Sequence, residues 1–221
     1  MTTRAALLVL ADGRFPAGGH AHSGGAEPAV KAGRIGNAQD LAEFCLGRLH
    51  TTGLVSAALA AAAAHGLDPL ALDEAADART PSPALRDVAR KLGRQLMRAA
   101  RATWPSHELA VLAEARPRGA HQPVVLGLTA RAAGLGPADA AHCAAYEAVS
   151  GPATAVVRLL SLDPFEATAV LARLAPALDQ IADQAAEAAR HGIGALPASS
   201  APLLDISAEA HAAWPVRLFA S

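Results

Sequence analysis

Residues 82–101, SPALRDVARKLGRQLMRAAR, carry a clear helical pattern that indicates the fold class of the chain. Its apolar residues recur at spacings of three and four positions: Leu85, Val88, Ala89, Leu92, Leu96 and Ala99. On a helix this spacing gathers them into one stripe, while the Arg, Lys and Gln side chains point the other way. Ser82 supplies a capping oxygen directly before Pro83, which suits the first helical position. The stretch therefore predicts a long amphipathic helix that buries one face.

The same helical signals run along the rest of the chain. Alanine and leucine are abundant and lose little entropy on entering a helix, whereas aromatic residues make up only 3% of the sequence. Asn37 is placed to cap a helix, and Asp68 and Asp163 each precede a proline, which repeats the start signal at Ser82. We therefore predict helices beginning at all three positions.

The later helices are expected to be separated by glycine or proline, with one over 138–149 and another over 154–162. No pair of alternating strand patterns joined by a turn occurs in the sequence. We predict an all-α fold, in which residues 1–221 form one compact domain of about eight to ten helices.

Composition and charge exclude several classes of function. The formal net charge is -1, and the basic residues are scattered, so nucleic acid is not an expected partner. Cys45 and Cys143 lie far apart and are expected to be buried thiols in a reducing compartment. The N-terminal apolar run is too short for a signal peptide, and the charge-free stretch 54–64 is about half a membrane span. We expect a cytoplasmic protein without a membrane segment.

Residues 12–25, DGRFPAGGHAHSGG, form a glycine-rich loop after the first apolar helix. A phosphate-binding loop needs exposed backbone N–H groups and usually a following Gly-Lys-Ser/Thr, which is absent here. We therefore expect no bound nucleotide, and we expect Ser23 to cap the helix that holds Glu27.

Two chemical alternatives remain open for this loop. Ser23 and His22 resemble part of a serine-hydrolase site, but a nucleophile elbow requires a strand that ends at the serine. His20 and His22 could instead bind nickel, because imidazole suits that metal, although no third ligand has a suggestive spacing. We predict no catalytic residue and no metal site, and keep both alternatives as hypotheses.

Residues 195–221 form a proline-containing apolar tail. Ordering about fifteen of its residues costs conformational entropy comparable to the gain from burying its apolar side chains. Two arrangements of the tail are therefore both possible: it folds onto its own domain, or it becomes ordered in the groove of a partner.

The loop and several later motifs resemble the urease accessory protein family UreF. The opening signature of that family is matched by residues 8–27, in which the segments LVLAD, FPAGG and HSGGAE occur in order. Further matches are LGRQL at 92–96, HQPVVLG at 121–127 and VVRLL at 156–160. PLLDI at 202–206 and the terminal RLFAS resemble its closing segment, so the resemblance covers essentially the whole chain.

The sequence departs from the family pattern in places. His20 replaces the usual Phe after the paired glycines, Ala21, Gly24 and Ala26 occupy variable positions, and the family's P-L-G is replaced by Ser-Leu-Asp at 161–163. These changes indicate a divergent, actinobacterial-like subgroup.

The resemblance implies a non-catalytic homodimer that assembles with UreD (also called UreH), recruits the GTPase UreG and engages apo-urease for nickel insertion. It implies no cofactor of its own, since nickel and GTP are handled by the partners. By analogy the tail docks on UreD and the loop lies at or near a partner interface. The residues assigned to partner contacts are Arg14, Pro16, Gly18, Gly19, His22, Ser23, Glu27, Leu203, Leu204, Ile206, Arg217, Leu218 and Phe219.

Overall fold

The computed structural model of the chain describes residues 4–220, so the predicted first three residues of the domain and the last residue of the closing motif lie outside the described part. The α-helices are α1 (Arg4–Ala11), α2 (Ala26–Lys31), α3 (Ala38–Arg48), α4 (Leu54–His65), α5 (Pro69–Ala78), α6 (Pro83–Thr103), α7 (His107–Ala115), α8 (Gln122–Ala132), α9 (Pro137–Leu160), α10 (Pro164–Arg190) and α11 (Pro202–Ala212). Over residues 4–220 there is no strand, which confirms the all-α prediction.

The predicted helix starts are confirmed by their capping geometry. The Asn37 side chain accepts hydrogen bonds from the backbone N–H groups of Gln39 and Asp40. Asp68, Ser82 and Asp163 accept in the same way at the starts of α5, α6 and α10, each with proline at the first helical position. These starts are local features, because a side chain and the amides two or three residues later suffice to form them.

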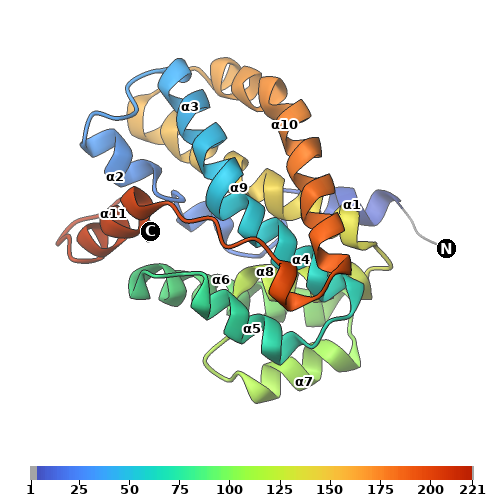
Figure 1. Cartoon of the computed structure of the whole chain (residues 1–221). Coiled ribbons are helices and arrows are strands. Elements are labelled where there is room, and N and C mark those ends of the chain that lie inside the picture. The colour runs from blue at the N-terminus through green and yellow to red at the C-terminus, as the bar shows by residue number, and fades with distance from the viewer. Residues whose placement is uncertain (1–3, 221) are drawn as a thin grey trace.

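The core is built around α4, whose sequence LVSAALAAAAAH is buried from Leu54 to Ala64 except at Ser56. Small alanine side chains let neighbouring helices approach closely, and α8, α9 and α10 all pack against α4 (Figure 1). The ideal Cβ position of Gly127 on α8 lies 2.1 Å from the Ala60 carbonyl oxygen, so any side chain there would clash. The centre of the molecule is therefore a close packing of helix backbones.

The prediction of separate helices over 138–149 and 154–162 is wrong, because α9 continues through Gly151 and Pro152 to Leu160. A proline inside a helix leaves the carbonyl four residues earlier without its N–H partner. That carbonyl belongs to Ala148, and the Arg48 side chain donates to it from Nε at 2.9 Å. Arg48 thereby supplies the hydrogen bond that Pro152 removes, and the helix remains continuous.

Helices α3 and α4 are joined without a break by one π-helical turn, Leu49–Gly53. Both cysteines are buried, as expected, and burial raises the pKa of each thiol to about 12. Of the helices within residues 4–220, none is both long and apolar enough to cross a bilayer.

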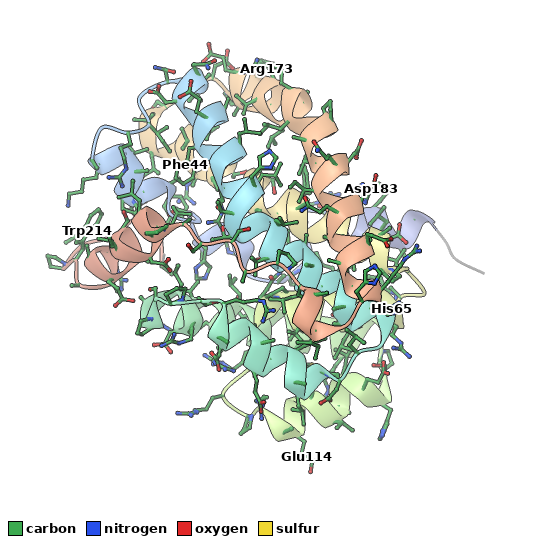
Figure 2. The ribbon with its side chains drawn as sticks, in the orientation of Figure 1. Phe44, His65, Glu114, Arg173, Asp183 and Trp214 are labelled. Atoms are coloured by element: carbon green, nitrogen blue, oxygen red, sulfur yellow. The ribbon has the colours of Figure 1, made fainter. Side chains whose placement is uncertain are left out.

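Helices α5, α6, α7 and α8 form the lower half of the molecule, whereas α11 lies to one side, beside α2 and the start of α6 (Figure 1). The described part of the predicted tail, residues 195–220, thus contains the helix α11 and folds back onto its own chain. Its indole, Trp214, lies at the outer edge of the molecule (Figure 2).

Candidate functional site: a surface formed by the loop and the tail

The first half of the glycine-rich loop is attached to α6. The ring of Phe15 stacks on Trp104, with ring centroids 5.8 Å apart. Gly18 has a φ of +81°, a backbone conformation that favours glycine, and Oε1 of Gln95 on α6 lies 1.4 Å from its ideal Cβ position. Between loop and helix lies a hollow of about 410 Å³ lined in part by Pro16 and Arg98. The loop is therefore held against a rigid helix.

The outer edge of the loop is charged. Arg14 donates from its backbone N–H and its guanidinium to the Asp12 carboxylate, at 2.9 Å and 2.6 Å. The hydrogen bonds from the Arg14 side chain and backbone lower the pKa of Asp12 to about 2. The side chain of Arg14 is 92% exposed, so this ion pair is accessible to a partner.

The second half of the loop passes between α9 and α11. Gly24 and Gly25 both have positive φ, and their ideal Cβ positions lie 3.1 Å from Pro152 on α9 and 3.1 Å from Leu204 on α11, respectively. The paired glycines therefore allow the loop backbone to lie close to both α9 and α11, which larger residues would prevent.

Glu27, in α2, joins the loop region to the tail. Its carboxylate accepts from the backbone N–H groups of Leu218 and Phe219 at 2.8 and 3.0 Å, and it lies 2.9 Å from Nε2 of His211. The residue is 8% exposed. A buried carboxylate is costly unless hydrogen bonds replace its water, and here the tail provides all three contacts.

The pKa of Glu27 reflects this balance. Burial acts to raise it, but the hydrogen bonds from Leu218, His211 and Phe219 outweigh burial, and the pKa lies below its ordinary value. Glu27 is therefore ionised at neutral pH, and its negative charge holds the end of the chain in place.

Further contacts attach the tail along its length. The ammonium of Lys31 lies 3.8 Å from the ring centroid of Trp214, and the guanidinium of Arg158 lies 4.9 Å from that of Phe219. The backbone N–H of Ala220 donates to the carbonyl of Ala21 at 2.8 Å, which links tail and loop directly. The tail thus packs against its own domain.

The segment before α11 and the helix itself are also attached to the body. Arg79 donates to the backbone carbonyls of Ile193, Leu196 and Pro197. The carboxylate of Glu209 accepts from the Ser82 hydroxyl and from the Ala84 amide at the start of α6.

Four large apolar side chains of the tail are exposed. Leu203 and Ile206, three residues apart on α11, are 55% and 67% exposed. Val216 and Leu218 are 82% and 55% exposed in the segment that follows. We call these four residues the apolar tail face; side chains of this kind gain from burial against another protein.

The residues predicted to contact partners fall into three groups. Those exposed are Arg14, Pro16, Gly19, Leu203, Ile206, Arg217 and Leu218. Those partly buried are Gly18, His22 and Leu204. Those buried are Ser23, Glu27 and Phe219, which hold loop and tail together within the chain.

The geometry of Ser23 does not fit the hydrolase hypothesis. Ser23 is fully buried, and its hydroxyl accepts from the backbone N–H of Glu27 at 3.2 Å, which confirms the expected capping contact. It follows a short 3₁₀ turn, Gly19–Ala21, and the extended His22, so no strand presents it at an elbow.

His20 lies within that 3₁₀ turn and His22 directly follows it, with His20 exposed and His22 half-buried. Burial, together with the nearby Lys91 and His20, lowers the pKa of His22. Across the described part of the chain, no three His, Cys, Asp or Glu side chains are grouped so as to hold a metal ion.

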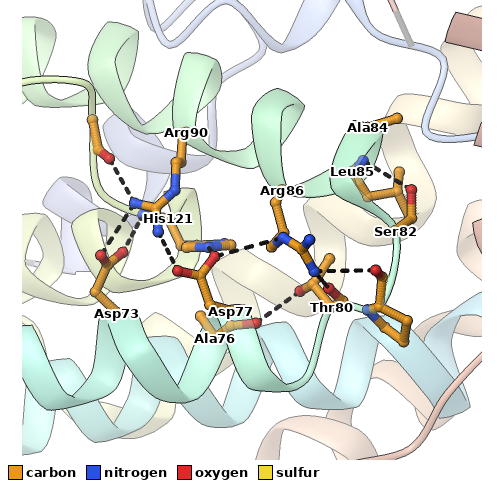
Figure 3. A network of polar contacts seen from close by, with 12 residues as sticks. Asp73, Ala76, Asp77, Thr80, Ser82, Ala84, Leu85, Arg86, Arg90 and His121 are labelled. Atoms are coloured by element: carbon orange, nitrogen blue, oxygen red, sulfur yellow. Dashed lines mark hydrogen bonds and ion pairs between the residues drawn. The ribbon is translucent and has the colours of Figure 1, made fainter. Parts of the chain in front are cut away.

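A buried polar network between α5, α6 and α8 was missed by the sequence reasoning (Figure 3). His121 lies 2.8 Å from Asp77 through Nε2 and donates its backbone N–H to Asp73 at 2.7 Å. Arg90 contacts both carboxylates, and Arg116 contacts Asp73 at 2.8 Å. The four-residue spacing of Asp73 and Asp77, which puts both acids on one helix face, was the available signal.

The network is a support for the fold. Burial lowers the pKa of His121, although Asp77 and Asp73 partly oppose it. Asp73 is 1% exposed and its carboxylate is surrounded by donors, as a buried charge requires.

Comparison with known sequences identifies the family of this all-helical protein. A sequence model of the UreF family matches residues 35–175. A urease accessory protein UreF from Mycobacterium sp. (strain JLS) is 44% identical over the whole of both chains. The UreF of Mycobacterium marinum is 45% identical, again over all of both chains, and that of Mycobacterium tuberculosis (strain H37Rv) is 42% identical over 96% of this chain and 95% of the relative.

The chain belongs to the UreF family of urease accessory proteins. The mycobacterial relatives confirm the expected subgroup. Both the family and the all-α fold were therefore correctly predicted from the sequence.

Proposed function

We propose that this chain is a non-catalytic scaffold for urease maturation, which assembles UreD and the GTPase UreG on apo-urease for nickel insertion. Membership of a family named for its accessory role to urease supports this function. The observation that carries the proposal is the apolar tail face, a set of four large apolar side chains of the tail that are all more than half exposed. In this proposal the partners bind nickel and GTP, and the chain contributes the binding surfaces that hold the partners together.

UreD is the partner proposed for the apolar tail face. Exposed apolar side chains at the centre of an interface contribute most of its affinity, whereas a charged rim sets orientation. Leu203 and Ile206 supply such a centre, and Arg14 supplies an accessible charge on the loop. We further propose that the protein works in the cytoplasm as a homodimer.

Point substitutions on the exposed face test this better than truncation, because deletion of residues 200–221 also removes the hydrogen-bond partners of the buried Glu27. The chain is co-expressed with UreD and UreG from the same source, and co-purification is measured. Leu203→Asp combined with Ile206→Asp is expected to abolish UreD recovery. Val111→Asp, at a 45% exposed position on α7, is the matched control.

Loss of UreD with the double variant, but not with the control, supports the scaffold and its interface. If the double variant still recovers UreD, then UreD binds a surface other than the one that contains Leu203 and Ile206. Normal urease activation in a strain lacking this gene would contradict the function itself. Calorimetry with nickel tests the remaining hypothesis at His20 and His22, since micromolar binding lost in a His20→Ala, His22→Ala variant would establish a metal site.

A further inference from the structure

A second surface, which none of the four residues of the apolar tail face lines, involves α6. It is a groove of about 1040 Å³ bounded by α5, α6 and the segment 115–119 that leads to α8. Its basic lining residues are Arg86, Arg90, Lys91, Arg94, Arg116 and Arg118. Its acidic lining residues are Asp73, Asp77 and Asp87. Six basic against three acidic residues make the groove positive in a chain whose formal net charge is -1.

Two of the three acidic residues already form ion pairs and hydrogen bonds with residues of the same chain. Asp73 is bound by Arg90, Arg116 and the His121 amide, and its side chain is 1% exposed. Asp77 is bound by Arg90 and His121 (Figure 3). These contacts form the inner wall of the groove and leave the outer basic residues to face solvent.

The outer wall carries cations available to a ligand. Lys91, Arg94 and Arg118 are exposed, and none of the ion pairs within the described residues includes them. The Arg94 guanidinium donates to the backbone carbonyl of Arg118, which ties α6 to the segment before α8. Asp87 is the exposed acid on this side.

The groove is formed in advance of binding. The ideal Cβ position of Gly93 lies 2.0 Å from the Ala120 carbonyl oxygen, and Gly119 has a φ of +100° with its ideal Cβ 2.4 Å from the Arg90 carbonyl oxygen. The two backbones that form the walls therefore touch at glycines and cannot close further. A rigid site loses little entropy on binding, which favours affinity.

The lining chemistry selects among anionic ligands. None of the lining residues named above is aromatic, so the groove has no platform on which nucleobases could stack. Arginine forks match carboxylates in a two-point geometry, and the volume exceeds what a single small anion fills. We propose that this groove binds an extended acidic segment of a partner protein through Lys91, Arg94 and Arg118.

The test uses the full-length chain and a fluorescein-labelled oligoglutamate peptide, followed by fluorescence anisotropy. Lys91→Glu with Arg118→Glu is expected to weaken binding by roughly tenfold or more, because two attractive charges become repulsive. Arg173→Glu with Arg190→Glu on α10 makes the same change in net charge at two residues that do not line the groove, and should leave binding unchanged (Figure 2 labels Arg173).

A variant that binds the peptide more tightly tests whether the loss of binding in the charge-reversal variant is due to misfolding, because a misfolded protein would not gain affinity. Asp87→Asn removes the exposed acid of the groove and is expected to tighten oligoglutamate binding, whereas Asp183→Asn on α10 is expected to leave it unaltered. Circular dichroism melts establish that every variant is folded.

Equal binding by the groove and control variants would overturn the proposal. Tighter groove-dependent binding of oligothymidylate, or of vesicles containing phosphatidylserine, would overturn it in favour of a nucleic acid or a membrane. Because the assay contains neither UreD nor urease, its outcome is independent of the scaffold function.

Discussion

Glu27 shows how one residue connects two distant parts of the sequence. It belongs to the motif that follows the glycine-rich loop, yet its hydrogen-bond partners His211, Leu218 and Phe219 are more than 180 residues away. The sequence indicated that Glu27 belongs to a partner interface. The structure gives it an internal role, because a buried carboxylate at this position requires the donors that the tail brings.

Replacing Glu27 with Gln keeps the shape but removes the charge. We expect the free energy of unfolding to fall by about 1–3 kcal/mol, because charge-assisted hydrogen bonds are lost and one amide donor is misplaced. Urea denaturation measures the change, and Glu114→Gln on the exposed side of α7 (Figure 2) is the control.

The same variant has a predicted pH dependence. The folded-state pKa of Glu27 lies below its ordinary value of 4.5, so its contribution is present above that pH and is lost as the pH falls through the folded pKa. The stability difference between wild type and Glu27→Gln should therefore shrink in acid. A difference independent of pH would show that ionisation of Glu27 does not matter.

Glu147 is predicted to have the opposite effect on the pH dependence of stability. Burial raises its pKa from 4.5 to about 7, although a hydrogen bond from Gln122 at 2.6 Å acts to lower it. The folded state then holds a proton that the unfolded state releases, so stability decreases as the pH rises from 4.5 towards 7. Denaturation across this range should show a smaller decrease for Glu147→Gln, and parallel curves would contradict the assignment.

At the scale of elements, helix packing depends on small residues at particular crossings. Gly127→Ala places a methyl group against the Ala60 carbonyl, so α8 and α4 must separate, at a cost of about 1–3 kcal/mol or more. Gly151→Ala on α9 is the matched control, because its Cβ would meet nothing within 4 Å. The control is expected to be neutral or stabilising by up to about 1 kcal/mol, owing to the higher helix propensity of alanine. Thermal and urea denaturation measure both, and equal effects would show that helix propensity outweighs the packing clash.

The continuity of α9 was not predictable from local sequence. Gly151-Pro152 is a usual helix-ending signal, yet α9 continues, and Arg48, about one hundred residues earlier, donates to the Ala148 carbonyl that Pro152 leaves without an N–H partner. Helix starts, in contrast, were predicted correctly at Asn37, Ser82 and Asp163, since a cap depends on neighbouring residues alone.

At the scale of the whole molecule, loop and tail should behave as one unit. In hydrogen exchange on the free protein, the amides of Leu218, Phe219 and Ala220 are expected to exchange slowly, because each donates to a backbone or carboxylate oxygen of the N-terminal region. Val216, 82% exposed, is the internal comparison within the same segment.

Glu27→Ala should accelerate exchange at all three amides together and leave Gly127 on α8 unaffected, because α8 lies in the core. Rapid exchange at these amides in the unaltered protein would mean that the tail orders only on a partner, the other state that the sequence left open.

The all-helical fold, the main helix starts and the family follow from the sequence alone, because apolar spacing, capping residues and ordered motifs are all read along the chain. Only the tertiary structure decided that loop and tail meet at Glu27, that Arg48 donates to the Ala148 carbonyl within α9, and that three separate segments form a positive groove. The physical reason is that a buried polar group must find its partner in space. That partner can lie anywhere in the sequence.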